Sequence, residues 1–195
     1  EILRALAETA SENSVDGVFA PLFWMFIGLT FWKINYLMPG PLALALIFKA
    51  SSTIDSMIGY KKEGLRWLGQ TGARLDDLLT FIPCRIVLIT LPLTCRSWSN
   101  FTHIVVNALK DGSKDQSPNS RLSEAIFAHC SKVRMGGSNT YQNKLIFKPI
   151  LAKNAPSPTI KGVKTILAMS LKLEFTWIFI FSLLYLLVPT LYNQG

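Results

Sequence analysis

The stretch ILAMSLKLEFTWIFIFSLLYLLV, residues 166–188, decides the class of fold, because only two of its 23 residues carry charge. As a helix it would be about 34 Å long at about 1.5 Å per residue, which exceeds the roughly 30 Å of hydrocarbon in a bilayer. We therefore expect a membrane helix here, with Lys172 and Glu174 near the end at which it enters the membrane.

Three earlier apolar stretches, residues 18–37, 42–60 and 78–95, are further membrane candidates, and residues 96–164 form a polar region. Of the whole chain, 50% is hydrophobic and 16% is charged, against about 25% charged in average proteins. The sequence predicts an all-α fold. We expect a polytopic integral membrane protein with about three to four membrane-embedded helices, forming a single membrane domain over residues 1–195.

The segments outside these candidates are expected to be short. Residues 1–16 predict a short amphipathic helix, and residues 59–72 a polar connection. In the polar region we expect a short helix near Leu122–Cys130. The sequence MGGSN, residues 135–139, predicts either a simple turn or a backbone nest that binds an anion.

The net charge of +8 fits the excess of Lys and Arg in the cytoplasmic loops of membrane proteins. No basic run with interleaved aromatic residues is present, so nucleic acid is excluded as a partner. Three cysteines without a CxxC pair and two histidines, at no familiar spacing, argue against a disulfide framework or a zinc site.

Two carboxylates follow an arginine in GARLDDLL, residues 72–79, directly before the third membrane candidate. Asp76 and Asp77 are expected at a helix N-terminus, where the helix dipole favours negative charge, and capping would explain one of them. Paired carboxylates beside Arg74 also suit Mg²⁺ holding phosphate oxygens. In residues 42–60, Asp55 shares a polar helix face with Lys49, Ser56 and Tyr60, as a structural ion pair or as a wall of an active site.

Five segments in order resemble one family. They are ETASENSVDGVFAPLFW (8–24), STIDSMIGYK (52–61), GARLDDLLTFIPCRI (72–86), SPNSRLSEA (117–125) and VRMGGSNTY (133–141). Together they resemble the CobD/CbiB family, adenosylcobinamide-phosphate synthase of cobalamin biosynthesis. The resemblance implies a multi-pass membrane enzyme. Its reaction would be the ATP-dependent formation of an amide between a propionate of adenosylcobyric acid and aminopropanol or its phosphate.

The resemblance carries over positions, and we infer their roles from the chemistry. We expect acid–base or charge-stabilising catalytic groups at Glu8, Glu12, Asp16, Asp55, Arg74 and Arg134, with Glu8 or Glu12 as the base toward the ammonium group of the amine. We expect substrate-binding groups at Asn13, Ser56, Tyr60, Asn119, Glu124, Gly136 and Gly137. We expect Asp76 and Asp77 to bind Mg²⁺, with ATP and the corrinoid as substrates.

The chain departs from the family pattern at Thr80, at Cys84 and over residues 129–132, which affects the packing of the helix near residue 130. The family carries further membrane helices upstream of the Glu8 motif, so we expect the chain to be truncated at its N-terminus. The oligomeric state stays open.

The location of the motifs depends on the third membrane candidate. Leu78 to Leu93 would be a helix of about 24 Å, shorter than the bilayer core, and it contains Pro83, Arg85 and Pro92. We predict that residues 78–97 lie re-entrant or tilted along the interface of the cell membrane. All motifs would then lie on the cytoplasmic side, where ATP is found.

Two other classes of function stay open on the residues alone. A Mg²⁺-dependent membrane phosphotransferase or prenyltransferase would also use aspartates at helix ends, and would form a lipid product. A non-enzymatic membrane subunit or transporter would place its polar set near the midplane of the bilayer, whereas most of the polar set here lies at segment ends.

Overall fold

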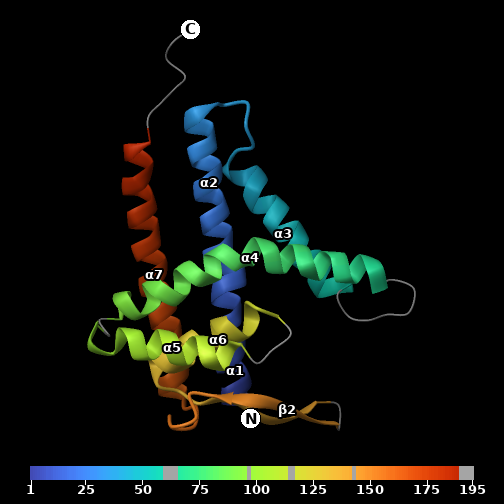
Figure 1. Cartoon of the computed structure of the whole chain (residues 1–195), viewed down its shortest axis with the longest axis vertical. Coiled ribbons are helices and arrows are strands. Elements are labelled where there is room, and N and C mark those ends of the chain that lie inside the picture. The colour runs from blue at the N-terminus through green and yellow to red at the C-terminus, as the bar shows by residue number, and fades with distance from the viewer. Residues whose placement is uncertain (59–65, 96–97, 114–116, 142–143, 189–195) are drawn as a thin grey trace. The chain divides into compact units, whose positions relative to one another are not determined.

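The computed structural model describes residues 1–58, 66–95, 98–113, 117–141 and 144–188 (Figure 1). The predicted helical fold is confirmed, with one small antiparallel hairpin added. The helices are α1 (Ile2–Ser14), α2 (Ala20–Ile34), α3 (Pro41–Ile58), α4 (Arg66–Thr94), α5 (Phe101–Gly112), α6 (Ser120–Ser131) and α7 (Ile160–Leu187). A π-helical turn, η1 (Val15–Phe19), joins α1 to α2, and a short 3₁₀ turn, η2 (Trp98–Asn100), precedes α5.

Three helical stretches are long and apolar enough to cross a membrane: Ile2–Ile34, Gly69–Thr94 and Ile160–Leu187. They include three of the four predicted candidates. The remaining candidate, residues 42–60, forms α3, which is not among the three. The short helix predicted over residues 1–16 is observed as α1, and the π-helical turn continues it directly into α2.

The third candidate is also longer than predicted. Helix α4 runs for 29 residues without interruption, so residues 66–72 are not a polar connection and Pro83 does not end the helix. Pro83 has no N–H to donate to the carbonyl of Leu79, four residues earlier. The indole nitrogen of Trp24 on α2 donates to that carbonyl instead, at 3.1 Å. Helix α4 is therefore about 43 Å long, and its length does not argue against a crossing.

The chain forms two compact units, which are described separately. Unit 1 contains Glu1–Val15 and Cys84–Leu173, and unit 2 contains Asp16–Pro83 and Glu174–Gly195.

Unit 1 is built around α6, whose residues 121–128 are all buried. Helix α5 packs against α6 (Figure 1), and the approach is close because Gly112 has no side chain. A Cβ atom at Gly112 would lie 3.0 Å from the Cα atom of Leu122. At the C-terminal end of α4, Lys172 Nζ donates to the Thr94 carbonyl at 2.6 Å, satisfying one of the free carbonyls of the last turn.

The hairpin of unit 1 consists of β1 (Met135–Tyr141) and β2 (Lys144–Leu151). The predicted turn at MGGSN is therefore wrong. The chain leaves α6 through Lys132, which has a left-handed backbone, and enters a strand with an irregular register between Met135 and Gly137. Gly136 and Gly137 have φ values of 79° and 97°, which glycine adopts without strain. The two glycines thus form a β-bulge rather than a turn.

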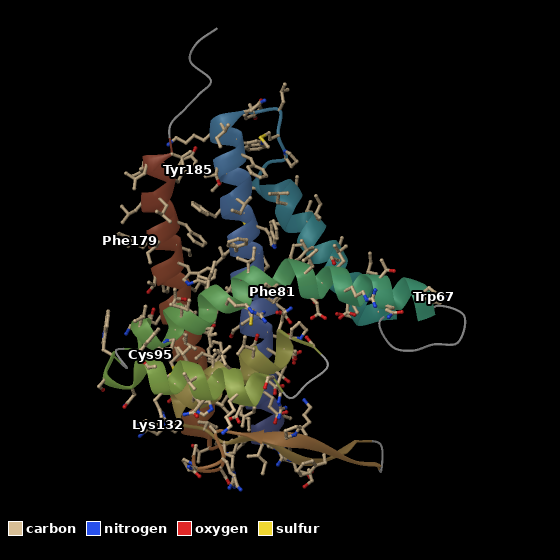
Figure 2. All side chains as sticks on the ribbon, viewed as in Figure 1. Trp67, Phe81, Cys95, Lys132, Phe179 and Tyr185 are labelled. Atoms are coloured by element: carbon tan, nitrogen blue, oxygen red, sulfur yellow. The ribbon has the colours of Figure 1, made fainter. Side chains whose placement is uncertain are left out.

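Unit 2 is held by aromatic packing. Phe26 on α2 stacks on Phe181 at 4.4 Å between ring centroids, and Trp177 lies 5.1 Å from Phe19 and 5.3 Å from Phe181. Many other apolar side chains of this unit are exposed, including Phe179 on α7 (Figure 2). An exposed apolar surface of this kind is expected of helices that face lipid.

Candidate functional site

The predicted site residues fall into both units. Glu8, Glu12, Asn13, Asn119, Glu124, Arg134, Gly136 and Gly137 lie in unit 1. Asp16, Asp55, Ser56, Arg74, Asp76 and Asp77 lie in unit 2. Tyr60 lies outside the described residues. Each unit contains one cluster of charged side chains, which we call the glutamate cluster in unit 1 and the aspartate cluster (Asp55, Asp76 and Asp77) in unit 2.

The glutamate cluster consists of Glu8, Arg121, Glu124, Lys148 and the backbone N–H of Gly136. Glu8 lies on the face of α1 that also buries Ala7 and Ser11, and its side chain is 6% exposed. Its Oε1 atom accepts a hydrogen bond from the Gly136 N–H at 2.8 Å. At the β-bulge one N–H, that of Gly136, thus contacts the carboxylate of Glu8, and the predicted backbone nest for an anion stays a prediction.

Lys148 on β2 connects the two buried carboxylates. Its ammonium group lies 3.4 Å from Oε2 of Glu8 and 3.6 Å from Oε1 of Glu124. Arg121 pairs with the other oxygen of Glu124 at 3.3 Å and also donates to the Pro149 carbonyl. The side chains of Arg121 and Glu124 are 1% and 2% exposed, whereas that of Lys148 is 42% exposed. Lys148 is therefore the member of the cluster that a solute can reach.

The pKa of Glu124 is raised to about 7: burial is the largest cause, the charges of Glu8 and Glu12 also raise it, and those of Lys148 and Arg121 act to lower it. Burial acts to lower the pKa of Lys148, but the carboxylates of Glu124 and Glu8 outweigh it, so the pKa is raised. Lys148 thus stays charged at neutral pH, and Glu124 exchanges a proton there. A carboxyl group with a pKa near the working pH is suited to general acid–base chemistry.

Sequence reasoning missed Lys148 and Arg121. Each is an isolated basic residue without a motif, and the residues that make them relevant are far apart in the chain. For Lys148, the only local indication in the sequence is that of a β-strand, in which alternate side chains point to the same face.

Other predicted residues of unit 1 already have structural partners. Glu12 accepts a hydrogen bond from the Ser120 hydroxyl at 2.6 Å. The amide oxygen of Asn119 accepts from Arg85, so this oxygen is engaged within the protein. Asn13 is exposed on α1. Of these residues, Asn13 best keeps its predicted role of contacting a substrate.

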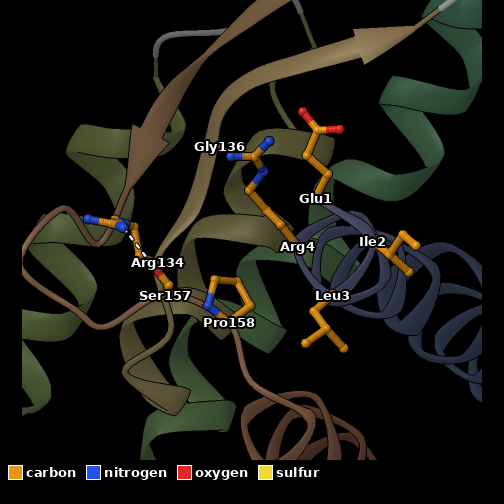
Figure 3. A pocket seen from close by; sticks show the side chains of 8 residues that line it. All are labelled: Glu1, Ile2, Leu3, Arg4, Arg134, Gly136, Ser157 and Pro158. Carbon is orange, nitrogen blue, oxygen red and sulfur yellow. Dashed lines mark hydrogen bonds between the residues drawn. The ribbon is translucent and has the colours of Figure 1, made fainter.

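Arg134 and Gly136 line a pocket of about 570 Å³ in unit 1 (Figure 3), whereas Gly137 is not among its lining residues. Arg134 is exposed, and its guanidinium group donates to the Ser157 hydroxyl at 2.6 Å. Arg4 enters the same pocket from α1 and donates to the Ser138 carbonyl.

The aspartate cluster arises where α3 and α4 approach closely. Gly72 permits this approach, because a Cβ atom there would lie 2.8 Å from Cγ2 of Ile54. Asp55 then lies close enough to Asp76 for their charges to interact, together with Asp77 and Lys49, and the Ser52 hydroxyl lies beside Asp76. Asp76 and Asp77 are ten or more residues inside α4, so the predicted placement at a helix N-terminus is wrong.

The remaining predicted residues of unit 2 lie outside the aspartate cluster. Arg74 is exposed on α4, and Ser56 is exposed on α3, where its hydroxyl donates to the Ser52 carbonyl at 2.8 Å. Asp16 lies in the π-helical turn. Turns of this kind occur frequently at functional sites.

The aspartate cluster fits Mg²⁺ better than a metal that needs a complete protein cage. Among the described residues, no three His, Cys, Asp or Glu side chains form a metal site. Mg²⁺ usually takes one or two carboxylates, with water and phosphate oxygens as its other ligands. The Oδ1 atom of Asp76 is buried without a hydrogen-bond partner in the described part of the chain, which leaves it available to a cation.

The long apolar helices and the two charged clusters define a polytopic helical membrane protein with ionisable sites built on its helices. The family model described as CobD/Cbib protein matches residues 1–170, so the chain belongs to the CobD/CbiB family. No solved structure matches the chain.

The chain is similar to several curated proteins. A cobalamin biosynthesis protein CobD from Synechocystis is 41% identical over 177 residues, which cover 91% of this chain and 49% of the relative. One from Streptococcus sanguinis is 34% identical over 192 residues, covering 96% and 56%. A cobalamin biosynthesis protein CbiB from Salmonella typhi is 37% identical over 158 residues, covering 76% and 43%. The chain thus spans about half the length of the curated relatives it matches.

Proposed function

We propose that the chain acts in cobalamin biosynthesis, as part of a membrane enzyme that joins aminopropanol or its phosphate to a propionate of adenosylcobyric acid. The names of the relatives support the pathway, and the resemblance of the motifs supports the reaction. The observation that carries the chemistry is the glutamate cluster, in which Glu124 has a pKa of about 7 beside the accessible ammonium group of Lys148.

The reaction proceeds in two steps, through an acyl phosphate. In the first, an oxygen of the propionate attacks the γ-phosphorus of ATP, forming an acyl phosphate and releasing ADP. In the second, the amine attacks the acyl carbon, the amide C–N bond forms, the C–O bond to the phosphate group breaks, and inorganic phosphate leaves with the proton that the nitrogen loses. The ammonium form of the amine must first lose one proton. Mg²⁺ would neutralise phosphate charge in the first step.

Glu124 takes up the proton by way of Lys148, the accessible member of the cluster, which gives one proton to Glu124 and takes one from the ammonium group. Both oxygens of each carboxylate are engaged within the protein, those of Glu8 by the Gly136 N–H and Lys148 and those of Glu124 by Lys148 and Arg121, so Glu124 is preferred for its pKa of about 7. We therefore add Glu124 to Glu8 and Glu12 as a candidate for the base. We assign Glu8 a positioning role: it keeps Lys148 beside Glu124.

The aspartate cluster supplies the metal ligands. Asp76 and Asp77 would hold Mg²⁺, and Asp55 adds negative charge to the same cluster. Arg74 lies on the same helix as the two metal ligands, where a guanidinium group is suited to phosphate oxygens.

The test is a reconstituted assay in detergent or nanodiscs, with adenosylcobyric acid, the amine or its phosphate, and Mg-ATP. It is run with this chain and with a chimera in which the chain replaces the matching part of the Synechocystis protein. We expect one amide, one ADP and one phosphate per turnover. ATP hydrolysis independent of the corrinoid, or a lipid product, would contradict the proposal.

Glu124→Gln tests the assigned base. The wild-type rate should rise as pH passes through about 7, and the variant should lose this rise together with most of its activity. The matched control is Glu174→Gln, the same change on α7 outside both clusters, which should leave the pH profile unchanged.

A further inference from the structure

The pocket in unit 1 is lined by two arginines that come from different elements. Arg4 belongs to the first turns of α1, and Arg134 lies between α6 and β1. Gly136, Ser157 and Glu1 also line the pocket, whose volume is about 570 Å³ (Figure 3). The pocket is thus large enough for a small organic ligand, and its lining carries two positive charges and one negative charge.

The two guanidinium groups are fixed in different ways. Arg4 donates to the Ser138 carbonyl, and one of its terminal nitrogens lies close to Gly137, where a Cβ atom would be 3.2 Å away. Arg134 donates to the Ser157 hydroxyl. A guanidinium group has five N–H donors, so it can bind the protein and a ligand at the same time. The absence of a side chain at Gly137 leaves room for the guanidinium group of Arg4.

We propose that this pocket binds a phosphate group between Arg4 and Arg134. Planar guanidinium donors match the oxygens of phosphate, and two of them neutralise a doubly charged group. The Ser157 hydroxyl is a further polar group on the wall of the same pocket.

In the reaction proposed above, on which this step rests, the pocket would hold the phosphate group of a reactant in unit 1. Gly136 connects the two sites. Its N–H holds Glu8 of the glutamate cluster, while the residue itself lines the pocket.

The test measures binding of inorganic phosphate to the protein in uncharged detergent by calorimetry, without ATP or corrinoid. Its failure is therefore distinguishable from failure of the ligase activity. We expect Arg134→Gln to weaken binding about 10-fold or more, as for loss of a charged hydrogen bond. Arg134→Lys should weaken it less, because the charge stays while the planar fork is lost.

Two further variants separate the pocket from general electrostatics. Lys132→Gln removes the same charge from an exposed residue nearby in sequence (Figure 2) and should leave binding unchanged. Glu1→Gln removes the negative charge of the lining and should tighten binding. The proposal is overturned if the wild-type protein does not bind phosphate, or if Lys132→Gln and Arg134→Gln weaken it equally.

Nanodiscs identify the source of the phosphate group. If phosphatidic acid, but not phosphatidylcholine, prevents phosphate binding to the wild type, the pocket takes a lipid headgroup. If phosphate binds equally in both, the pocket takes a soluble phosphate compound. Either result supports a phosphate pocket.

Discussion

The glutamate cluster and the aspartate cluster both gather carboxylates, but they balance the charge differently. In the glutamate cluster each buried carboxylate has a cation or an N–H of the protein against it. In the aspartate cluster three carboxylates interact with one another, and Lys49 is the cation that acts on Asp76. One buried oxygen of Asp76 has no hydrogen-bond partner among the residues that the structure describes.

The difference indicates different roles. A cluster whose carboxylates already face cations or an N–H needs no added cation, and Glu124 within it has a pKa of about 7. Three carboxylates that interact with one another, two of them in a helix apolar enough for a membrane, are costly unless cations lie beside them. This difference fits the proposal of proton transfer at the first cluster and metal binding at the second.

The strongest way to break this comparison is to show that the clusters face different compartments. Lys62→Cys and Ser113→Cys are introduced separately into a chain with Cys84→Ala, Cys95→Ser and Cys130→Ala. We expect an impermeant thiol reagent to label neither from outside intact cells and both after permeabilisation. Since α4 is long enough to cross, this expectation rests on the need of the reaction for cytoplasmic ATP.

Labelling of one position alone from outside would mean that the intervening segment crosses the membrane. The assignment of both clusters to one reaction would then have to be given up.

The next largest effect concerns the aspartates. Asp76→Asn and Asp77→Asn should each reduce turnover about 100-fold or more while the protein still inserts into membranes, because a metal ligand is lost. The measurement is turnover against Mg²⁺ concentration. Lys49→Gln should act in the opposite direction and lower the Mg²⁺ concentration needed for half-maximal rate. Near-normal turnover of both Asn variants at limiting Mg²⁺ would rule out the metal role.

The glutamate cluster should make the free energy of unfolding depend on pH. The pKa of Glu124 is raised from 4.5 to about 7 in the folded protein, so the contribution of this group is fully present below about pH 4.5 and is lost as pH rises to about 7. The loss amounts to roughly 3 kcal/mol. Melting curves of wild type and Glu124→Gln, followed by tryptophan fluorescence between pH 4 and 8, should diverge with pH. Parallel curves would show that Glu124 is not perturbed.

The helices that could be predicted from the sequence are those that depend on residues close together in the chain. The helix at 166–188 was predicted because its apolar residues are nearly continuous, and the short helix predicted near Leu122–Cys130 is observed as α6. The C-terminal end of α4 was predicted within a residue, but its start was missed, because Gly72 and Pro83 are helix breakers by local rules. Their neighbours across unit 2, Ile54 and Trp24, make both acceptable within a helix.

For the site residues too, local motifs could be predicted from the sequence, whereas contacts between distant parts of the chain could not. Motif residues such as Glu8 and Glu124 were named from the sequence, and the structure joins them through Lys148. The hydrogen bond between Glu8 and Gly136 joins residues 128 positions apart, so no local pattern could predict it. The roles of the site residues stay predictions.

The smallest effect tests the hydrogen bond between Trp24 and Leu79. Trp24→Phe should lower the free energy of unfolding by about 1–3 kcal/mol, because the Leu79 carbonyl loses its donor. In a Pro83→Ala background the cost should be smaller, since the alanine would supply a backbone N–H to the same carbonyl. A double-mutant cycle of unfolding in mixed micelles measures the difference. Equal costs in the two backgrounds would show that Trp24 stabilises by packing alone.

The same hydrogen bond has a consequence for how the chain is made. Ribosomes deliver Trp24 well before Leu79, so the donor is already in place when the carbonyl exposed by Pro83 reaches the insertion machinery. A helix with an unpaired carbonyl is disfavoured in hydrocarbon, and α4 is therefore released into lipid most readily after α2. The order of synthesis and the position of one proline together favour a sequence of assembly in which the earlier helix receives the later one.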